Sequence, residues 1–92
     1  MTTVRLTGQL ICSTNDEAAR VREHVALHVQ LTRDEPGCLS FTVVQTENPL
    51  VWQVDEEFVD AAAFHTHQTR AAASEWARET AGIARSYTTE GL

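Results

Sequence analysis

The chain has 92 residues, the length of one domain, so we expect residues 1–92 to form a single domain with no room for a second. A domain this small buries only about 60–65% of the surface that its unfolded chain exposes, so its core is thin and a second copy would extend it. The formal net charge of −6 and the complete lack of lysine exclude the clustered basic surface that nucleic acid binding requires.

The first expected element is a strand over residues 4–12. Apolar side chains occupy alternate positions there, which is typical of a strand that buries one face. The side chains on that face are Val4, Leu6, Leu10 and Cys12. Gly8 lies in the middle, where a glycine weakens a strand unless a close neighbour needs the space.

A long helix is expected next. Thr14 and Glu17 have the spacing of a capping box, and the helical period of apolar residues then continues to about Arg33. The residues with this period are Ala18, Val21, Val25, His28 and Val29. Glu35-Pro36-Gly37 ends the helix, because proline cannot continue it and glycine permits a turn.

Two further strands, over residues 38–46 and 51–58, form a predicted antiparallel hairpin. The turn signal Glu47-Asn48-Pro49 lies between them, and so short a connection is typical of paired neighbours. Each strand again alternates. The side chains sharing one face are Leu39, Phe41 and Val43 in the first strand, and Trp52, Val54 and Phe58 in the second.

In the last part of the chain, the sequence predicts a second helix and a short final strand. Asp60 is a good N-cap for a helix over residues 61–81, with a break near Thr69-Arg70, where the apolar stripe changes phase. Gly82 suits the end of this helix, with Ile83 as its apolar partner. Residues 85–89 would then add a fourth strand.

The resulting order, β-α-β-β-α-β, is that of an α+β, ferredoxin-like fold whose helices cover one face of an antiparallel sheet. The other face is half apolar, which favours a homodimer packed sheet against sheet, as in a dimeric α+β barrel. A simple solvated face is the alternative. The side chains on this face are Arg5, Thr7, Gln9, Ile11, Ser40, Thr42, Val44, Val51 and Gln53.

The sequence predicts that the protein is not associated with a membrane. No apolar run approaches the ~20 residues of a membrane span. The start, Met1-Thr2-Thr3-Val4-Arg5, lacks the regions of a signal peptide, so we expect a cytoplasmic location, where thiols stay reduced. Cys12 and Cys38 fall in predicted strands and are interpreted as small buried thiols; a disulfide or a nucleophile is the alternative.

Two groups of residues carry a family resemblance. The first is Glu35-Pro36-Gly37-Cys38-Leu39, followed by the alternating Phe41-Thr42-Val43. The second comprises Phe58, Asp60, Ala61-Ala62, Phe64, His67 and Trp76. In this order and spacing they resemble the antibiotic biosynthesis monooxygenases, a family that includes the small quinol monooxygenases.

The resemblance implies a ferredoxin-like dimer with stacked sheets and a pocket between the sheet and the helices of each chain. It also implies a cofactor-independent monooxygenase. Such an enzyme would oxidise a phenolic, anthrone or hydroquinone-type aromatic substrate with molecular oxygen, and would use no metal, flavin or haem.

That chemistry needs a phenol to lose its proton, because the anion gives an electron to oxygen more readily than the neutral form. It requires a base, a dry aromatic pocket and a hydrogen-bond donor for the oxyanion. We interpret His67 as the base, since a free imidazole titrates at about pH 6.5. Phe64, one helical turn earlier, would form an apolar wall beside the imidazole ring. Trp52 and Trp76 would sandwich a flat substrate. Phe41 is expected to line the same pocket.

Simpler roles are open for these residues. His67 as a capping or surface histidine, and both tryptophans as core residues, are the alternatives. His24 and His28 are four residues apart on the first helix and could hold a metal with His65 or His67. Spacing fixes no third ligand, so we expect no metal site, with His24 exposed, His28 partly buried and His65 solvated.

Two other functions are compatible with the fold. Haem-cleaving relatives share it, but the corresponding positions here carry Thr7 or Gly8, His67 and Ala77, and the iron ligand is missing. A non-catalytic dimeric domain that binds a small molecule is the other. An enclosed cavity containing His67 and an indole favours the enzyme, whereas a filled core favours the binding domain.

Overall fold

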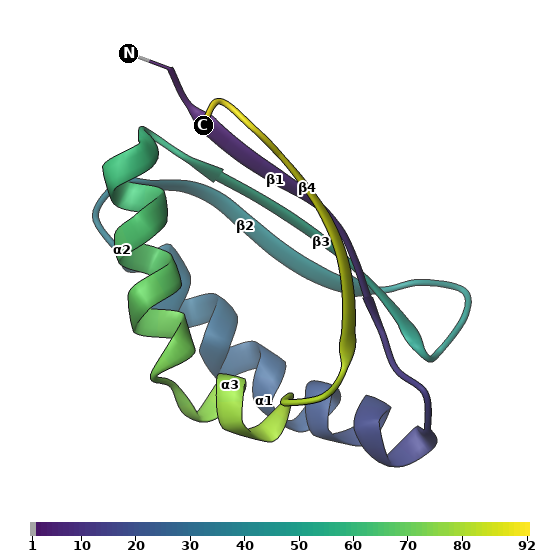
Figure 1. The fold of residues 1–92 in the computed structure, drawn as a ribbon. Coiled ribbons are helices and arrows are strands. Elements are labelled where there is room, and N and C mark those ends of the chain that lie inside the picture. The colour runs from purple at the N-terminus through teal and green to yellow at the C-terminus, as the bar shows by residue number, and fades with distance from the viewer. Residues whose placement is uncertain (1) are drawn as a thin grey trace.

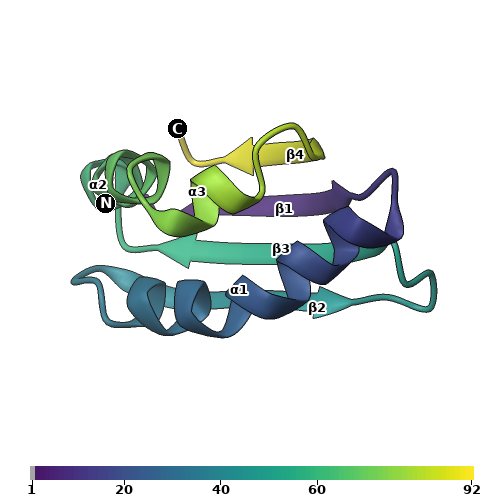
Figure 2. The same cartoon turned by 90° about the horizontal axis from the view of Figure 1, so that it is seen from below.

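The computed structural model describes residues 2–92. In chain order the elements are β1 (Val4–Ile11), α1 (Asn15–Arg33), β2 (Cys38–Gln45), β3 (Val51–Phe58), α2 (Ala61–Ala72), α3 (Glu75–Glu79) and β4 (Ala84–Glu90) (Figure 1). The strands form one antiparallel sheet in the order β2-β3-β1-β4. The helices lie on one face of it (Figure 2). The predicted ferredoxin-like α+β fold is therefore confirmed, with its second helix divided into α2 and α3.

Alternating side chains give the sheet one buried and one exposed face. The buried positions of β1 are Val4, Leu6 and Leu10, as the sequence predicts. On the exposed face, polar groups pair across strands. Arg5 donates to the Glu57 carboxylate at 2.6 Å, and the Thr7 hydroxyl donates to Asp55 at 2.6 Å.

A bulge near the start of β2 overturns one prediction. The pairing of β2 with β3 shifts by one residue just before the pair Ser40–Glu57, which leaves Leu39 as the extra residue. Leu39 is therefore 51% exposed rather than packed in the core with Phe41. Beyond the bulge the alternation resumes, and Phe41 is buried as expected.

The helix α1 begins at the predicted capping box, with one difference. The Thr14 side chain accepts from the N–H of Glu17 at 3.1 Å, and the Glu17 carboxylate accepts from the N–H of Ser13 at 2.6 Å, not from that of Thr14. After α1, Gly37 has a φ of 93°, and a Cβ there would lie 2.6 Å from the Cβ of Ala63. Only glycine fits this turn, which packs against the start of α2.

The second predicted helix breaks later than expected. α2 continues past Thr69-Arg70, because its alanine-rich turns favour helix whatever the phase of the apolar stripe. The break occurs at Ser74. Its hydroxyl donates to the carbonyl of Ala71 at 2.6 Å and accepts from the N–H of Ala77 at 3.3 Å, so one side chain ends α2 and caps α3.

The chain then turns at Gly82, buries Ile83 and adds β4 beside β1, which confirms the predicted fourth strand. Both cysteines are free: Cys12 is buried just past the end of β1, and Cys38 is half-buried in β2. Burial raises the pKa of both thiols, so neither is poised as a nucleophile. Within the described residues, no helix combines the length and the apolar character needed to cross a bilayer.

Candidate active site

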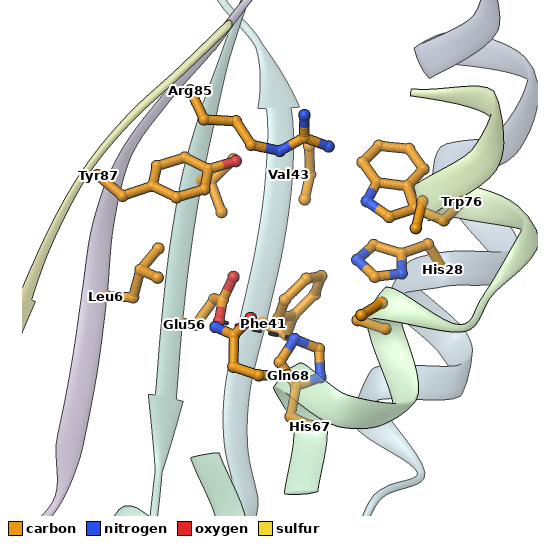
Figure 3. Close-up of a pocket in the computed structure, with 14 residues that line it drawn as sticks. Leu6, His28, Phe41, Val43, Glu56, His67, Gln68, Trp76, Arg85 and Tyr87 are labelled. Carbon is orange, nitrogen blue, oxygen red and sulfur yellow. Dashed lines mark ion pairs between the residues drawn. The ribbon is translucent and has the colours of Figure 1, made fainter. Parts of the chain in front are cut away.

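A cavity of about 390 Å³ lies between the inner face of the sheet and the helices (Figure 3). This volume is within the roughly 300–1,000 Å³ that is usual for small-molecule sites. Every strand and every helix contributes to its walls. The lining side chains are those of Leu6, His28, Phe41, Val43, Val54, Glu56, His67, Gln68, Ala71, Ala72, Trp76, Ala77, Arg85 and Tyr87.

His67, on α2, is a buried polar wall residue whose position is fixed by a series of contacts. Only 3% of it is exposed, and its Nδ1 lies 3.0 Å from Oε1 of Glu35, in the turn after α1. The other oxygen of Glu35 accepts from Nε of Arg70 at 2.6 Å. Arg70 also donates to the hydroxyl of Thr32 at 2.9 Å. The carboxylate that orients the imidazole is thus itself held in place.

These contacts set the protonation of His67. A carboxylate only accepts, so the contact places the ring proton on Nδ1 and leaves Nε2 with a free lone pair. Burial lowers the pKa of His67, while Glu35 opposes the shift and Arg70 adds to it. The net direction is downward, so the ring is neutral and basic at neutral pH.

Glu56 is a site residue that the sequence analysis did not single out. It lies on the inner face of β3, 6% exposed, with Oε1 3.8 Å from Nε2 of His67. That oxygen has no hydrogen-bond partner among residues 2–92. Burial, followed by repulsion from Glu35, raises the pKa of Glu56 to about 7. The alternation of Trp52, Val54 and Phe58 does place position 56 inward, and this was the available signal.

Aromatic rings form one end of the cavity. His28 stacks on Trp76 with ring centroids 4.5 Å apart and planes 4° from parallel, and it meets the ring of Phe41 edge-on at 5.2 Å. Burial, with the charge of Arg70 as the next cause, lowers the pKa of His28 to about 3. His28 is therefore a neutral flat surface, buried more deeply than the sequence predicted.

The helix histidines do not form the metal site that their spacing allowed. His28 faces the cavity, whereas His24 is half-buried and lies 3.9 Å from Glu75 on α3. With Glu79, the residues His24 and Glu75 place ligand atoms within 4.8 Å of one another. His65 is exposed, as expected.

The strand β4 supplies the wall opposite the helices. Tyr87 on β4 is paired directly with Gly8 on β1, and a Cβ at Gly8 would lie 2.8 Å from Cδ1 of the Tyr87 ring. The missing side chain thus makes room for Tyr87, which answers why a glycine interrupts this strand. Arg85 faces Trp76 across the cavity (Figure 3), while its guanidinium donates to the Thr80 hydroxyl at 2.8 Å.

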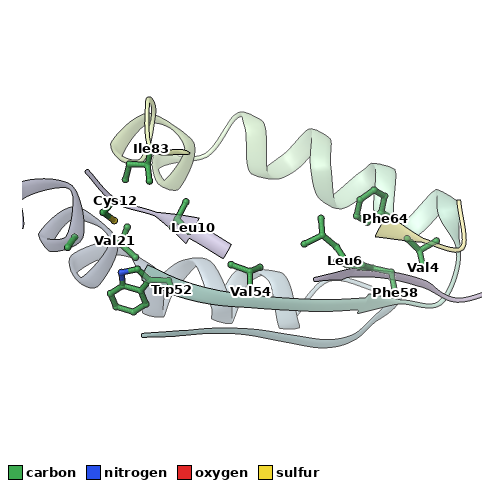
Figure 4. Packing of buried hydrophobic residues seen from close by; sticks show 11 residues of the cluster. Val4, Leu6, Leu10, Cys12, Val21, Trp52, Val54, Phe58, Phe64 and Ile83 are labelled. Atoms are coloured by element: carbon green, nitrogen blue, oxygen red, sulfur yellow. The ribbon is translucent and has the colours of Figure 1, made fainter. Parts of the chain in front are cut away.

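Two predicted pocket residues lie elsewhere. Trp52 and Phe64 belong to the hydrophobic core and do not line the cavity (Figure 4). Phe64 packs against Phe58 with ring centroids 5.8 Å apart. The structure brings His67, Phe41 and Trp76 together around the cavity, so the expected sandwich of two tryptophans does not form.

The arrangement combines three chemical capacities. A flat aromatic molecule finds apolar surface on the sheet side and rings on the helix side. His67 offers a neutral nitrogen to a hydroxyl group, with a carboxylate behind it to stabilise the imidazolium. Glu56 offers a second proton-carrying group beside it.

Comparisons with known proteins give a consistent result. Residues 13–79 match the protein family described as Antibiotic biosynthesis monooxygenase. No curated protein matches the chain.

Several solved structures share the fold. One is a Nitrosomonas europaea protein provisionally described as an antibiotic biosynthesis monooxygenase, with 18% identity and a TM-score of 0.83 over 99% of this chain and 90% of that one. SnoaB, a cofactor-independent oxygenase from Streptomyces nogalater, is 11% identical with a TM-score of 0.81 over 100% and 94%. NE2512, a protein of unknown function from Nitrosomonas europaea, is 21% identical with a TM-score of 0.78 over 100% and 90%.

Proposed function

Because the chain belongs to the antibiotic biosynthesis monooxygenase family, we propose that it is a cofactor-independent monooxygenase that oxidises a phenolic, anthrone or hydroquinone-type aromatic substrate with molecular oxygen. The observation that carries the proposal is His67. This ring is 3% exposed, lines a cavity with aromatic walls and is held through Nδ1 by Glu35 at 3.0 Å. A neutral, oriented imidazole in such surroundings is what a general base requires.

In the proposed reaction, the substrate hydroxyl gives its proton to Nε2 of His67. The O–H bond breaks, an N–H bond forms, and the new imidazolium is stabilised by the Glu35 carboxylate. The substrate anion then transfers electrons to oxygen. The substrate gains one oxygen atom at a ring or benzylic carbon and loses two hydrogens in all, from that carbon or from its hydroxyl groups. The second oxygen atom leaves with these hydrogens as water, so the substrate supplies all the electrons.

The walls of the cavity support the binding of an aromatic substrate. Phe41, Trp76 and neutral His28 offer flat surfaces to an aromatic ring. Ala71 and Ala72 on α2 have short side chains, which leave the space between these aromatic surfaces open.

Oxygen uptake in air-saturated buffer tests the proposal. Chelator-treated protein would be mixed with a panel of anthrones and hydroquinones, and the products analysed by mass spectrometry after reaction in ¹⁸O₂. We expect uptake above the uncatalysed rate and one labelled oxygen atom per product molecule. Absence of product across the panel would refute the oxygenase.

The same panel identifies the alternative function. A Trp52→Phe variant leaves Trp76 as the only tryptophan, so its fluorescence reports binding in the cavity. Quenching without oxygen uptake would assign the chain as a non-catalytic small-molecule-binding domain.

We propose that the working form is a homodimer joined through the outer face of the sheet. The apolar residues Val44 and Ile11 on this face are 59% and 37% exposed. A Val44→Asp change should produce monomers in sedimentation velocity. Leu27→Asp, on α1 and matched at 56% exposed, should leave the dimer intact. A wild-type protein that sediments as a monomer would contradict the dimer.

A further inference from the structure

Two buried groups of the cavity lining, one on the sheet and one on a helix, face each other without a bond. Nε2 of His67 and Oε1 of Glu56 are 3.8 Å apart, which is too long for a hydrogen bond. The Glu56 side chain is 7% exposed, and Oε1 has no hydrogen-bond partner in the described part of the chain. A buried polar oxygen without a partner is costly, so this pair is arranged to receive a third group.

The separation suits one oxygen atom. An oxygen about 2.8 Å from both atoms completes a triangle with two hydrogen bonds of ordinary length. A hydroxyl there donates its proton to Nε2 of His67, and a protonated Glu56 donates to the hydroxyl oxygen. The terminal torsion of a glutamate is broad, so the carboxyl group can turn to make this bond at little cost.

We propose that Glu56 is a second catalytic residue, whose protonated carboxyl group donates a hydrogen bond to the substrate oxygen that His67 deprotonates. This inference rests on the proposed function for the identity of the substrate. In the step, the substrate O–H bond breaks and an N–H bond forms on His67. Glu56 keeps its proton and stabilises the phenolate, so it acts as the oxyanion donor that the chemistry requires.

The charges around Glu56 favour its protonated form. The titratable and charged groups around it are His28 on α1, Glu35 in the turn after α1, Cys38 on β2, His67 on α2, and Arg85 and Tyr87 on β4; Arg70 on α2 contacts Glu35.

Neither cation in this set is available to Glu56. Arg70 donates to Glu35 at 2.6 Å, and Arg85 donates to the carbonyl of Ile83 at 2.9 Å. Glu35 repels a second carboxylate, and the remaining neighbours are neutral. Burial and this repulsion raise the pKa of Glu56 to about 7, consistent with a carboxyl group that keeps its proton in mildly acidic solution.

The substrate class follows from this geometry. One hydroxyl oxygen must both lose a proton and accept a hydrogen bond, so the pair selects free phenols and hydroquinones. An aryl methyl ether of the same shape carries no proton for His67 and should neither be activated nor compete strongly for the cavity.

Binding of 4-nitrophenol, whose phenolate is yellow, tests the pair without any turnover when oxygen is removed from the solution. Its bound form should ionise about one to two pH units lower than in water with the wild-type protein, because both groups favour the anion. Glu56→Gln keeps a donor and should retain most of the shift. Glu56→Leu has no donor and should lose at least half of it, and His67→Gln should lose nearly all.

The matched control is Glu57→Gln, the neighbouring position on β3 that faces outward, which should leave the shift unchanged. Circular dichroism would verify that each variant is folded. Equal loss in Glu56→Gln and Glu56→Leu would overturn the donor role, because it would mean that the ionised carboxylate acts as the base. An unchanged shift in Glu56→Leu would overturn it as well.

The two proposals can fail separately. If bound 4-nitrophenol ionises at the expected lower pH but no phenol causes oxygen uptake, the oxygenase is rejected and the role of the His67–Glu56 pair in binding the proton and the oxyanion is retained. If turnover is found, the wild-type rate should fall as the pH rises above about 7, where Glu56 loses its proton. Glu56→Gln should lack this decline, and Glu56→Leu should be slower by about 100-fold.

Discussion

Glu56 and Glu57 are neighbours on β3, yet their surroundings differ completely. Glu57 projects outward and accepts from Arg5 at 2.6 Å. Glu56 projects inward, where its Oε1 has no hydrogen-bond partner within residues 2–92. The outward carboxylate thus has a partner within the chain, whereas the inward carboxyl group leaves one oxygen unsatisfied. That difference marks the inner position as the one prepared for a ligand.

The largest effect should come from replacing His67, the proposed base on the inner side of the sheet. His67→Gln keeps a polar side chain but removes a group that can accept a proton at neutral pH. We expect kcat for an anthrone or hydroquinone to fall by about 100- to 10,000-fold. His65→Gln, on the same helix but exposed, should have little effect. Similar losses in both variants would assign the effect to the helix and not to the base.

Stability against pH sharpens the contrast between the two glutamates. The pKa of Glu56 is about 7 in the native state, above its ordinary 4.5, so the native state binds the proton more tightly than the unfolded chain. The contribution of Glu56 to the free energy of unfolding should therefore fall as the pH rises from about 4.5 to 7, by roughly 2–3 kcal/mol. The lowered pKa of His28 acts in the opposite direction in both proteins, so the loss should appear as a change in the stability difference between the wild type and Glu56→Gln when urea unfolding is compared at pH 5 and pH 8. Glu57→Gln should keep the loss; its disappearance there would contradict the assignment to Glu56.

A smaller effect is expected from the wall of the cavity. Gly8→Ala places a Cβ 2.8 Å from the ring of Tyr87 and against the carbonyl of Ser86, so β4 must shift. We expect the free energy of unfolding to fall by about 1–3 kcal/mol, and binding of aromatic ligands to weaken as Tyr87 moves. Gln9→Ala, the next residue but on the outer face, should change neither by as much. An unaltered affinity in Gly8→Ala would show that Tyr87 is not needed at the wall.

The smallest effect should come from the outer pair. Arg5→Ala removes the contact with Glu57, but both groups reach solvent and such pairs add little to stability. The midpoint of thermal unfolding should be nearly unchanged, and any difference should disappear in high salt. A large, salt-resistant loss would show that the outer face also depends on its charges.

Much of the fold could be predicted from the periodicity of apolar residues and from the residues that begin or end helices. Alternation located the first three strands, Thr14 and Asp60 located two helix starts, and Glu35-Pro36-Gly37 located the first helix end. Local patterns failed where a long-range contact decides. The bulge that exposes Leu39 depends on the pairing with β3, and the helix break at Ser74 depends on two side-chain hydrogen bonds that no apolar stripe records.

The site was less predictable for a physical reason. Periodicity tells which face a side chain occupies but not how far along the element the cavity lies, so Trp52 and Phe64 face inward yet fill the core. Glu56 was overlooked because a buried carboxyl group is uncommon. Glu35 was noticed only as part of a turn, since nothing in its sequence position indicates that it meets a residue 32 positions away.

The contact of Gly37 with Ala63 has a consequence for how the chain tolerates change. It joins the turn that carries Glu35 to the helix that carries His67, so their spacing is fixed by two of the smallest residues in the protein. A larger side chain at either position would act as a wedge, separating carboxylate from imidazole while leaving both intact. Loss of catalysis without loss of any reacting group would be the signature of such variants.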